Sequence, residues 1–141
     1  MKLIVVDNEP DRLEELVKCL RAAITNAEIT DFTSPSLAVQ YSFENPVDLV
    51  FDEYYTRRFN GIQVAAAIHH FRPETMIYLV TDDNTGLAKK KNKEIIGCLV
   101  RPFVITDIQK RIERDSKTWE RKLRIKNNVI SSHSRPRRNK L

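Results

Sequence analysis

Hydrophobic and polar positions follow two alternating periods along the chain, which predicts strands and helices in turn. Short, continuous apolar runs are typical of parallel strands that are buried on both faces. Longer segments with an apolar residue every three or four positions are typical of helices. The predicted strands are 3–6, 27–32, 48–51, 76–80 and 95–100. The predicted helices are 11–24, 35–43, 62–71 and 106–125, with a weak, lysine-rich segment at 86–94.

Proline and hydroxyl residues indicate where several helices begin. Pro10 falls in the first turn of the first helix, where its missing N–H does no harm. Ser34 followed by Pro35 predicts an N-cap and a first helical residue. Thr106 is the expected cap of the last helix. The strand at 27–32 alternates in polarity, so we expect it near an edge of the sheet.

Strands that alternate with helices across short loops indicate an α/β protein with a parallel sheet. Because crossovers between parallel strands are right-handed, we expect a flavodoxin-like, doubly wound sheet of five strands in the order 2-1-3-4-5. Helices should cover both faces. The region 84–94 is expected to be irregular.

The composition narrows the class of protein. The 141 residues are 41% hydrophobic and 30% charged, which is typical of one soluble globular domain. No apolar run approaches the length of a membrane span, and Asp7 interrupts the N-terminal apolar run too early for a signal peptide. Cys19 and Cys98 have no paired spacing, so we expect buried, reduced thiols in a cytoplasmic protein.

The net charge of +5 is unevenly distributed. Residues 117–141 hold nine Lys or Arg and one acid, whereas residues 1–116 hold 15 bases and 18 acids. We therefore expect a mildly acidic domain at 1–116, followed by a basic helical extension and a disordered tail at 117–141. A basic arm of this kind fits an acidic partner or nucleic acid. It has neither a sequence-reading motif nor interleaved aromatic residues, so nucleic acid is the minority interpretation.

Polar residues gather where the predicted parallel strands end. In an open α/β sheet, ligands bind beyond the carboxyl ends of the strands. Those ends carry Asp7, Asn8 and Glu9, then Asp52 and Glu53, then Thr81 and Arg101. Clustered carboxylates need a divalent cation or a nearby base, and oxygen ligands of this kind suit Mg²⁺. The sequence therefore predicts a charged site at this edge.

Residues 2–114 resemble the receiver domain of bacterial two-component response regulators. The resemblance rests on Leu3-Ile4-Val5-Val6-Asp7-Asn8-Glu9-Pro10, on 46–51, on Asn60-Gly61, on Thr81 and on Arg101-Pro102-Phe103. Receivers take a phosphoryl group from a histidine kinase onto an aspartate. They use an acidic pair for Mg²⁺, a threonine or serine for the phosphoryl oxygen, and a lysine before proline as counter-charge.

The chain departs from this pattern at three of those positions. Asp7 and Thr81 match, but Asn8 stands at the second acid and Arg101 at the lysine. An ungapped alignment places Glu53 at the acceptor position, and the alternative, Asp52, requires gaps. Because neighbouring strand residues point to opposite faces, only one of the two can face the site. We favour Glu53, with Asp52 turned away.

These departures have physical consequences. Asn8 removes a negative ligand, so any Mg²⁺ held by Asp7 should be bound weakly. Glu53 could form an ion pair with Arg101 and imitate the contact of a phosphoryl group with the family's lysine. The following loop adds Arg57 and Arg58 near the site.

The resemblance leaves two classes of function. The first, which we favour, is an atypical receiver-like module that signals through protein–protein contacts without phosphorylation, cofactor or enzymatic activity. Its partner would be a histidine kinase, an output protein or a second copy of the chain. The second is a working phosphoacceptor that uses Asp52 with Mg²⁺. A DNA-binding regulator acting through the basic tail is a further alternative, whereas no motif supports an enzyme or a membrane protein.

Overall fold

The computed structural model describes residues 1–56, 60–82 and 94–138, with side chains as far as residue 128. The chain forms two compact units, 1–109 and 110–141. The predicted segment 86–94 falls almost entirely outside the described residues, as do Arg57 and Arg58. None of the described helices is both long and apolar enough to cross a membrane.

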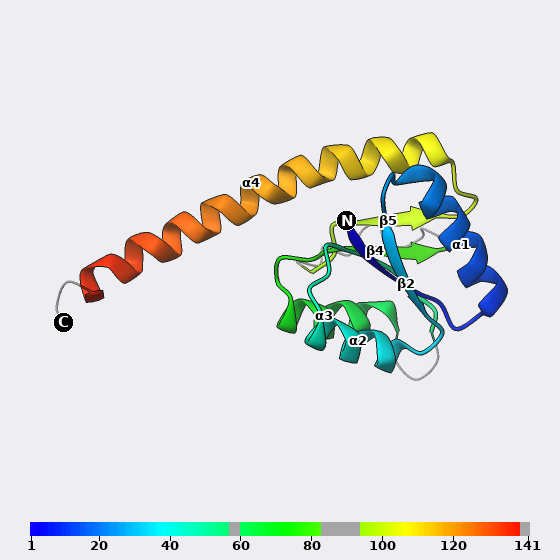
Figure 1. The fold of residues 1–141 in the computed structure, drawn as a ribbon, viewed down its shortest axis with the longest axis horizontal. Helices are drawn as coiled ribbons and strands as arrows, with labels where there is room; N and C mark the ends of the chain where they lie inside the picture. Colours follow the sequence, from blue (N-terminus) through cyan, green and yellow to red (C-terminus); the bar gives the residue numbers. More distant parts are fainter. Residues whose placement is uncertain (57–59, 83–93, 139–141) are drawn as a thin grey trace. The chain divides into compact units, whose positions relative to one another are not determined.

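The first unit is built on a parallel sheet of five strands in the order β2-β1-β3-β4-β5, as predicted (Figure 1). The strands are β1 (Lys2–Val6), β2 (Glu28–Phe32), β3 (Leu49–Glu53), β4 (Met76–Thr81) and β5 (Gly97–Val100). The helices are α1 (Pro10–Ala23), α2 (Pro35–Glu44), α3 (Gly61–Phe71) and α4 (Ile105–Arg138), of which α4 continues into the second unit.

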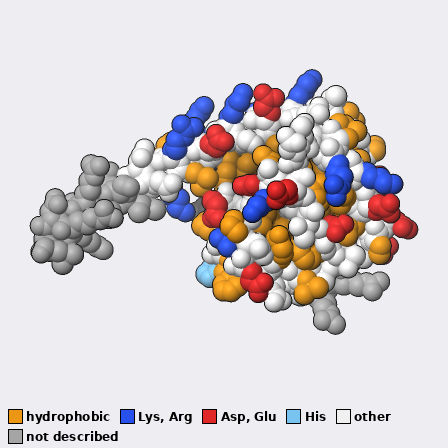
Figure 2. All heavy atoms as spheres, in the orientation of Figure 1, with side chains coloured by type: hydrophobic (Ala, Val, Ile, Leu, Met, Phe, Trp, Pro, Cys, Tyr) orange, Lys and Arg blue, Asp and Glu red, His pale blue; other side chains and the backbone are white. Residues whose placement is uncertain are grey.

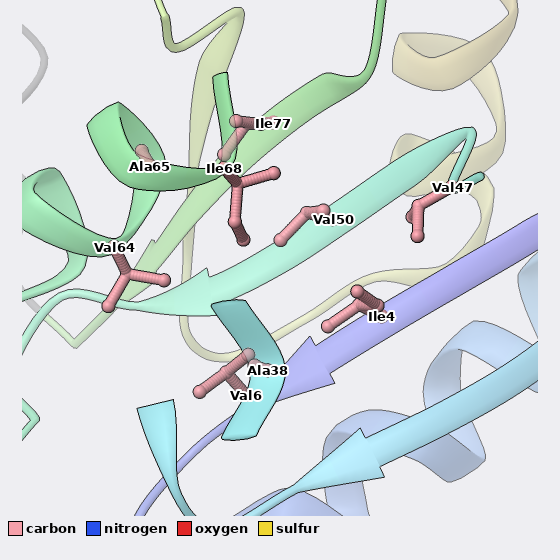
Figure 3. Close-up of a cluster of buried hydrophobic side chains, with 9 residues drawn as sticks. All are labelled: Ile4, Val6, Ala38, Val47, Val50, Val64, Ala65, Ile68 and Ile77. Atoms are coloured by element: carbon pink, nitrogen blue, oxygen red, sulfur yellow. The ribbon is translucent and has the colours of Figure 1, made fainter. Parts of the chain in front are cut away.

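Helices cover both faces of the sheet. On one face, α2 and α3 enclose a hydrophobic cluster whose members come from both helices, the three inner strands and the loop before β3 (Figure 3). These are Ile4, Val6, Ala38, Val47, Val50, Val64, Ala65, Ile68 and Ile77. On the other face, α1 buries its apolar stripe of Leu13, Leu16, Val17 and Leu20. Burial of this kind stabilises the fold by about 25 cal/mol for each Å² of apolar surface removed from water.

Helices α1 and α2 begin as expected, and α3 begins with a cap that the sequence analysis did not identify. Pro10 is the first residue of α1. Ser34 caps α2, because its hydroxyl accepts the backbone N–H of Leu37 at 3.4 Å. Asn60 begins α3 with a reciprocal capping box to Gln63, at 3.0 and 2.8 Å. These caps fix where the loops above the carboxyl edge of the sheet end.

Three expectations need correction. Strand β3 was expected to stop at residue 51, but Asp52 and Glu53 continue its pairing with Leu79 and Val80 of β4. Thr106 lies inside α4, because the Val104 carbonyl accepts the N–H groups of residues 107 and 108 and makes Val104 the residue before the helix. Helix α4 continues to Arg138, beyond the predicted end near residue 125.

Neither Cys19 nor Cys98 forms a disulfide among the described residues, but both are only partly buried. Cys19 lies beside the apolar stripe of α1, whose fully buried members are Leu16 and Leu20. Cys98 belongs to β5, which is an edge strand of the sheet. Full burial was therefore wrong, because a position next to a buried stripe or on an edge strand keeps contact with solvent.

Candidate functional site

The carboxyl edge of the sheet brings charged residues from separate strands together. Asp7 directly follows β1, Glu53 ends β3, Thr81 ends β4 and Arg101 directly follows β5. The backbone N–H of Arg101 donates to the Thr81 carbonyl at 2.9 Å, which continues the β4–β5 ladder by one more bond. This register places the Arg101 side chain above the ends of the inner strands.

Arg101 contacts three carboxylates at this edge. Its Nη1 lies 2.9 Å from Oε2 of Glu53, and its Nη2 donates to Oδ2 of Asp7 at 3.2 Å. Nη1 also donates to Oδ1 of Asp82 at 3.2 Å. The Arg101 side chain is 13% exposed and that of Glu53 is fully buried. The contact between Glu53 and Arg101 that the sequence suggested is thus present in the structure.

Arg12, from the first turn of α1, contacts the same three carboxylates. Its Nη2 lies 2.9 Å from Oε1 of Glu53 and its Nε 3.5 Å from Oδ2 of Asp7. Its Nη1 lies 3.8 Å from Oδ2 of Asp82. Each oxygen of Glu53 therefore faces a different guanidinium group, while both groups share one oxygen of Asp7. We call Asp7, Arg12, Glu53, Asp82 and Arg101 the charge cluster.

Arg12 and Asp82 were missed by the sequence analysis. A signal for Arg12 existed, because a cation in the first turn of a helix faces the positive end of the helix dipole and is unfavourable there without an anionic partner. Asp82 directly follows Thr81, at the strand end already singled out. Its side chain is 64% exposed, so it forms the outer side of the charge cluster.

The other predicted residues have different surroundings. The side-chain amide of Asn8 donates to the Thr33 carbonyl at 2.8 Å, in the loop that follows β2. Thr81 is fully buried at the end of β4. Asp52 is also fully buried, and neither of its carboxylate oxygens has a hydrogen-bond partner among the described residues. Strand alternation directs it to the face opposite Glu53.

Burial dominates the electrostatics of these acids. It raises the pKa of Asp7 despite the backbone N–H of Glu9 and the two nearby arginines, which lower it. Burial likewise raises the pKa of Glu53 against the opposing effect of Arg101 and Arg12. The pKa of Asp52 lies well above 3.8, because it is buried and next to the Glu53 charge. For Arg12, burial lowers the pKa, but the carboxylates of Glu53, Asp7 and Asp82 outweigh it and raise it.

The side chains at this edge do not fit a Mg²⁺ ion. The carboxylate oxygens of Asp7 and Glu53 that could act as ligands already face guanidinium groups at 2.9 to 3.5 Å. Asn8, at the position of a second acidic ligand, donates its amide elsewhere. Within the described part of the chain, no group of three or more His, Cys, Asp or Glu residues is arranged to hold a metal ion.

Several solved structures share this architecture. A CheY-like response regulator receiver domain from Methanospirillum hungatei superposes with a TM-score of 0.73 at 14% identity, covering 86% of this chain and 97% of that one. The signal receiver domain of an HD domain-containing protein from Pseudomonas fluorescens gives 0.74 at 21% identity, covering 87% and 91%. The chain has the receiver-domain fold. Neither family models nor curated proteins match its sequence.

A third structure with this architecture was solved with bound ligands. The response regulator TrrA from Thermotoga maritima, in complex with Mg²⁺ and a beryllium fluoride, superposes with a TM-score of 0.71 at 21% identity, covering 81% of this chain and 97% of that one. This identity shows a common fold and no more. The charge cluster of the present chain must therefore be interpreted from its own residues.

Proposed function

We propose that the chain is a receiver-like regulatory module that acts in signal transduction through protein–protein contacts, without phosphorylation and without catalysis. The observation that supports this proposal is the position of Glu53. It occupies the acceptor position suggested by the family resemblance, and both of its oxygens lie 2.9 Å from an arginine nitrogen.

A carboxylate held in this way supplies the negative charge that a phosphoryl group would bring to a receiver. Arg101 stands at the position of the family's lysine and contacts Glu53 directly. Because Glu53 is part of the chain itself, its contact with Arg101 needs no kinase to form it. The module would accordingly offer its partner the same binding surface at all times. That partner would be a histidine kinase, an output protein or a second copy of the chain.

The alternative is a phosphoacceptor at Asp52. Its side chain is fully buried, and burial raises its pKa well above 3.8, which disfavours the ionised carboxylate that a nucleophile requires. Transfer of a phosphoryl group would require β3 to expose it and a Mg²⁺ ion to displace arginine. Both requirements count against this alternative.

Incubation with acetyl phosphate and Mg²⁺, followed by intact-mass measurement, tests the proposal. We expect no stable gain of a phosphoryl group by the wild-type chain. D52N separates the alternatives, and D48N, which changes an exposed acid near the start of β3, is the matched control. A phosphoryl adduct on wild type and D48N that D52N loses would establish the phosphoacceptor instead.

The same preparation tests whether binding depends on phosphorylation. Affinity capture from the native extract, with and without acetyl phosphate and Mg²⁺, should yield the same partner in the same amount. A partner that is captured only after treatment with acetyl phosphate would contradict the proposal. A chain carrying E53Q serves as the comparison, because it loses the carboxylate of Glu53 while keeping nearly the same volume.

A second candidate function rests on α4. Lys110, Arg114, Lys117 and Arg121 are all exposed, and their spacing of four, three and four residues places them on one face of the helix. Figure 2 shows Lys and Arg side chains on the surface of the protein, interspersed with Asp and Glu. Such a stripe suits the phosphates of nucleic acid, with affinity that falls steeply as salt rises. Binding of the full chain to duplex DNA, compared with a variant carrying Gln at these four positions, tests this function.

A further inference from the structure

Arg12 is surrounded by carboxylate oxygens from three acidic residues. Three oxygens converge on its guanidinium group, namely Oε1 of Glu53, Oδ2 of Asp7 and Oδ2 of Asp82. They come from residues at the ends of three neighbouring strands, β3, β1 and β4. Carboxylate oxygens are the ligands that hard divalent cations prefer. Arg12 therefore supplies positive charge at the point where these three carboxylates approach one another.

The charges of the cluster lead to the same conclusion. Three carboxylates and two guanidinium groups carry a formal charge of −1. Without Arg12 the charge would be −2, with Glu53 fully buried and Asp7 nearly so. Buried carboxylates that are this close repel one another, so a second positive charge beside Arg101 is needed to keep them ionised.

We propose that Arg12 is the built-in cation of this site: it takes the place that a divalent metal ion would fill, and it keeps the carboxyl edge closed to Mg²⁺. The inference rests on the proposed function in one respect, that the site works in the absence of a phosphoryl group. It adds that the site also works without a metal, because a side chain of α1 supplies the charge. Arg12 thereby ties the first turn of α1 to the ends of three strands.

Replacement of Arg12 should therefore create a metal site. Arg12→Gln removes the charge, and the 35% exposure of the Arg12 side chain means that an ion can enter from solvent. The electrostatic attraction gained when one positive charge leaves a partly buried site corresponds to about tenfold or more in affinity for a divalent ion. The three carboxylates remain to act as ligands.

The experiment is a titration with Mn²⁺ alone, followed by electron paramagnetic resonance of the free ion, without any phosphodonor. Wild type should show no binding below millimolar Mn²⁺, whereas R12Q should bind at least about tenfold more tightly. R12K retains the charge and should behave as wild type. Adding D7N to R12Q should remove the binding. K18Q, which removes an exposed lysine paired with Glu14 on the same helix, is the matched control.

Two outcomes would overturn the inference. The first is Mn²⁺ binding to the wild type at the charge cluster as tight as binding to R12Q. The second is no gain in R12Q and in R12M, a further variant that keeps the aliphatic stem so that a folding defect of R12Q cannot decide the result. The Mn²⁺ titration contains no phosphodonor, so its result does not depend on whether the chain can be phosphorylated. Phosphorylation of the wild type by acetyl phosphate, in the separate experiment, would contradict the proposed function without changing the interpretation of the Mn²⁺ titration.

Discussion

Asp52 and Glu53 are consecutive residues of β3, but only the carboxyl group of Glu53 lies against arginine side chains. Glu53 forms ion pairs at 2.9 Å with a nitrogen of Arg12 and of Arg101, whereas Asp52 has none among the described residues, although the carboxylate oxygens of both acids lack a hydrogen bond there. Both side chains are fully buried. Alternation along the strand separates a paired acid from an unpaired one by a single position.

The Glu53 ion pairs should contribute measurably to stability. E53Q keeps the volume but removes the charge that faces Arg12 and Arg101, so we expect the free energy of unfolding to fall by about 2 kcal/mol. Urea unfolding measures the change. E14Q, which removes an exposed acid paired with Lys18, should change it by less than about 0.5 kcal/mol.

The effects of E53Q and E14Q on the free energy of unfolding should also differ in their dependence on salt. The exposed Lys18–Glu14 pair is screened by salt, but the buried Glu53 contacts are screened far less. The loss caused by E53Q should persist at high ionic strength. An E53Q protein as stable as wild type would show that the charge cluster is not a stabilising contact.

The buried Asp52 should make stability depend on pH. Its pKa in the folded state is well above 3.8, so the folded protein keeps a proton that the unfolded chain releases. The free energy of unfolding linked to this group therefore falls as pH rises from about 4 towards the raised pKa. The raised pKa values of Asp7 and Glu53 act in the same direction.

Two substitutions isolate the contribution of Asp52. D52N cannot titrate, so the stability of wild type relative to D52N should fall as the pH is raised from 4 to 7. D52V removes the unsatisfied acceptors and should stabilise the protein at pH 7 by about 1–3 kcal/mol. Thermal unfolding of the three proteins across this range provides the comparison, and parallel curves for wild type and D52N would contradict the argument.

The backbone that follows β3 leaves no room for a side chain at Gly61. A Cβ atom at this position would lie 2.8 Å from the Glu53 carbonyl oxygen and 2.9 Å from the Tyr54 Cα. G61A should therefore destabilise the protein by about 1–3 kcal/mol, although alanine is the better helix former. The measurement is chemical unfolding. A66S, on the exposed side of α3, is the control and should cost less than about 1 kcal/mol. Stabilisation by G61A would mean that the backbone has room to move.

The sheet was predictable from the sequence because its inner strands are continuous runs of apolar residues. Leu3 to Val6 form a run that only a strand covered on both faces can bury, and the short loops leave few ways to connect such strands. The face that Glu53 presents was also predictable, because it follows from strand alternation. The end of β3 was not, because two acids after an apolar run resemble the start of a loop.

The partners of the site residues were harder to predict. Helical periodicity identifies Arg12 as a polar position of α1, but it does not tell which polar side chain extends over the strand ends. The position of Asp82 relative to Glu53 depends on the register of β4 with β3, which is a property of the tertiary structure. For Thr106, local propensity favoured a cap, but the carbonyl of Val104 accepts the first N–H groups of α4 instead.

The charge cluster joins positions that are remote along the chain, with Asp7 and Arg101 separated by 94 residues. Contacts of such long range close large loops, and the chain gains them only after most of the sheet is assembled. Interactions absent from the folding transition state slow unfolding while leaving the folding rate almost unchanged. We therefore expect the charge cluster to lengthen the lifetime of the folded protein without accelerating its formation.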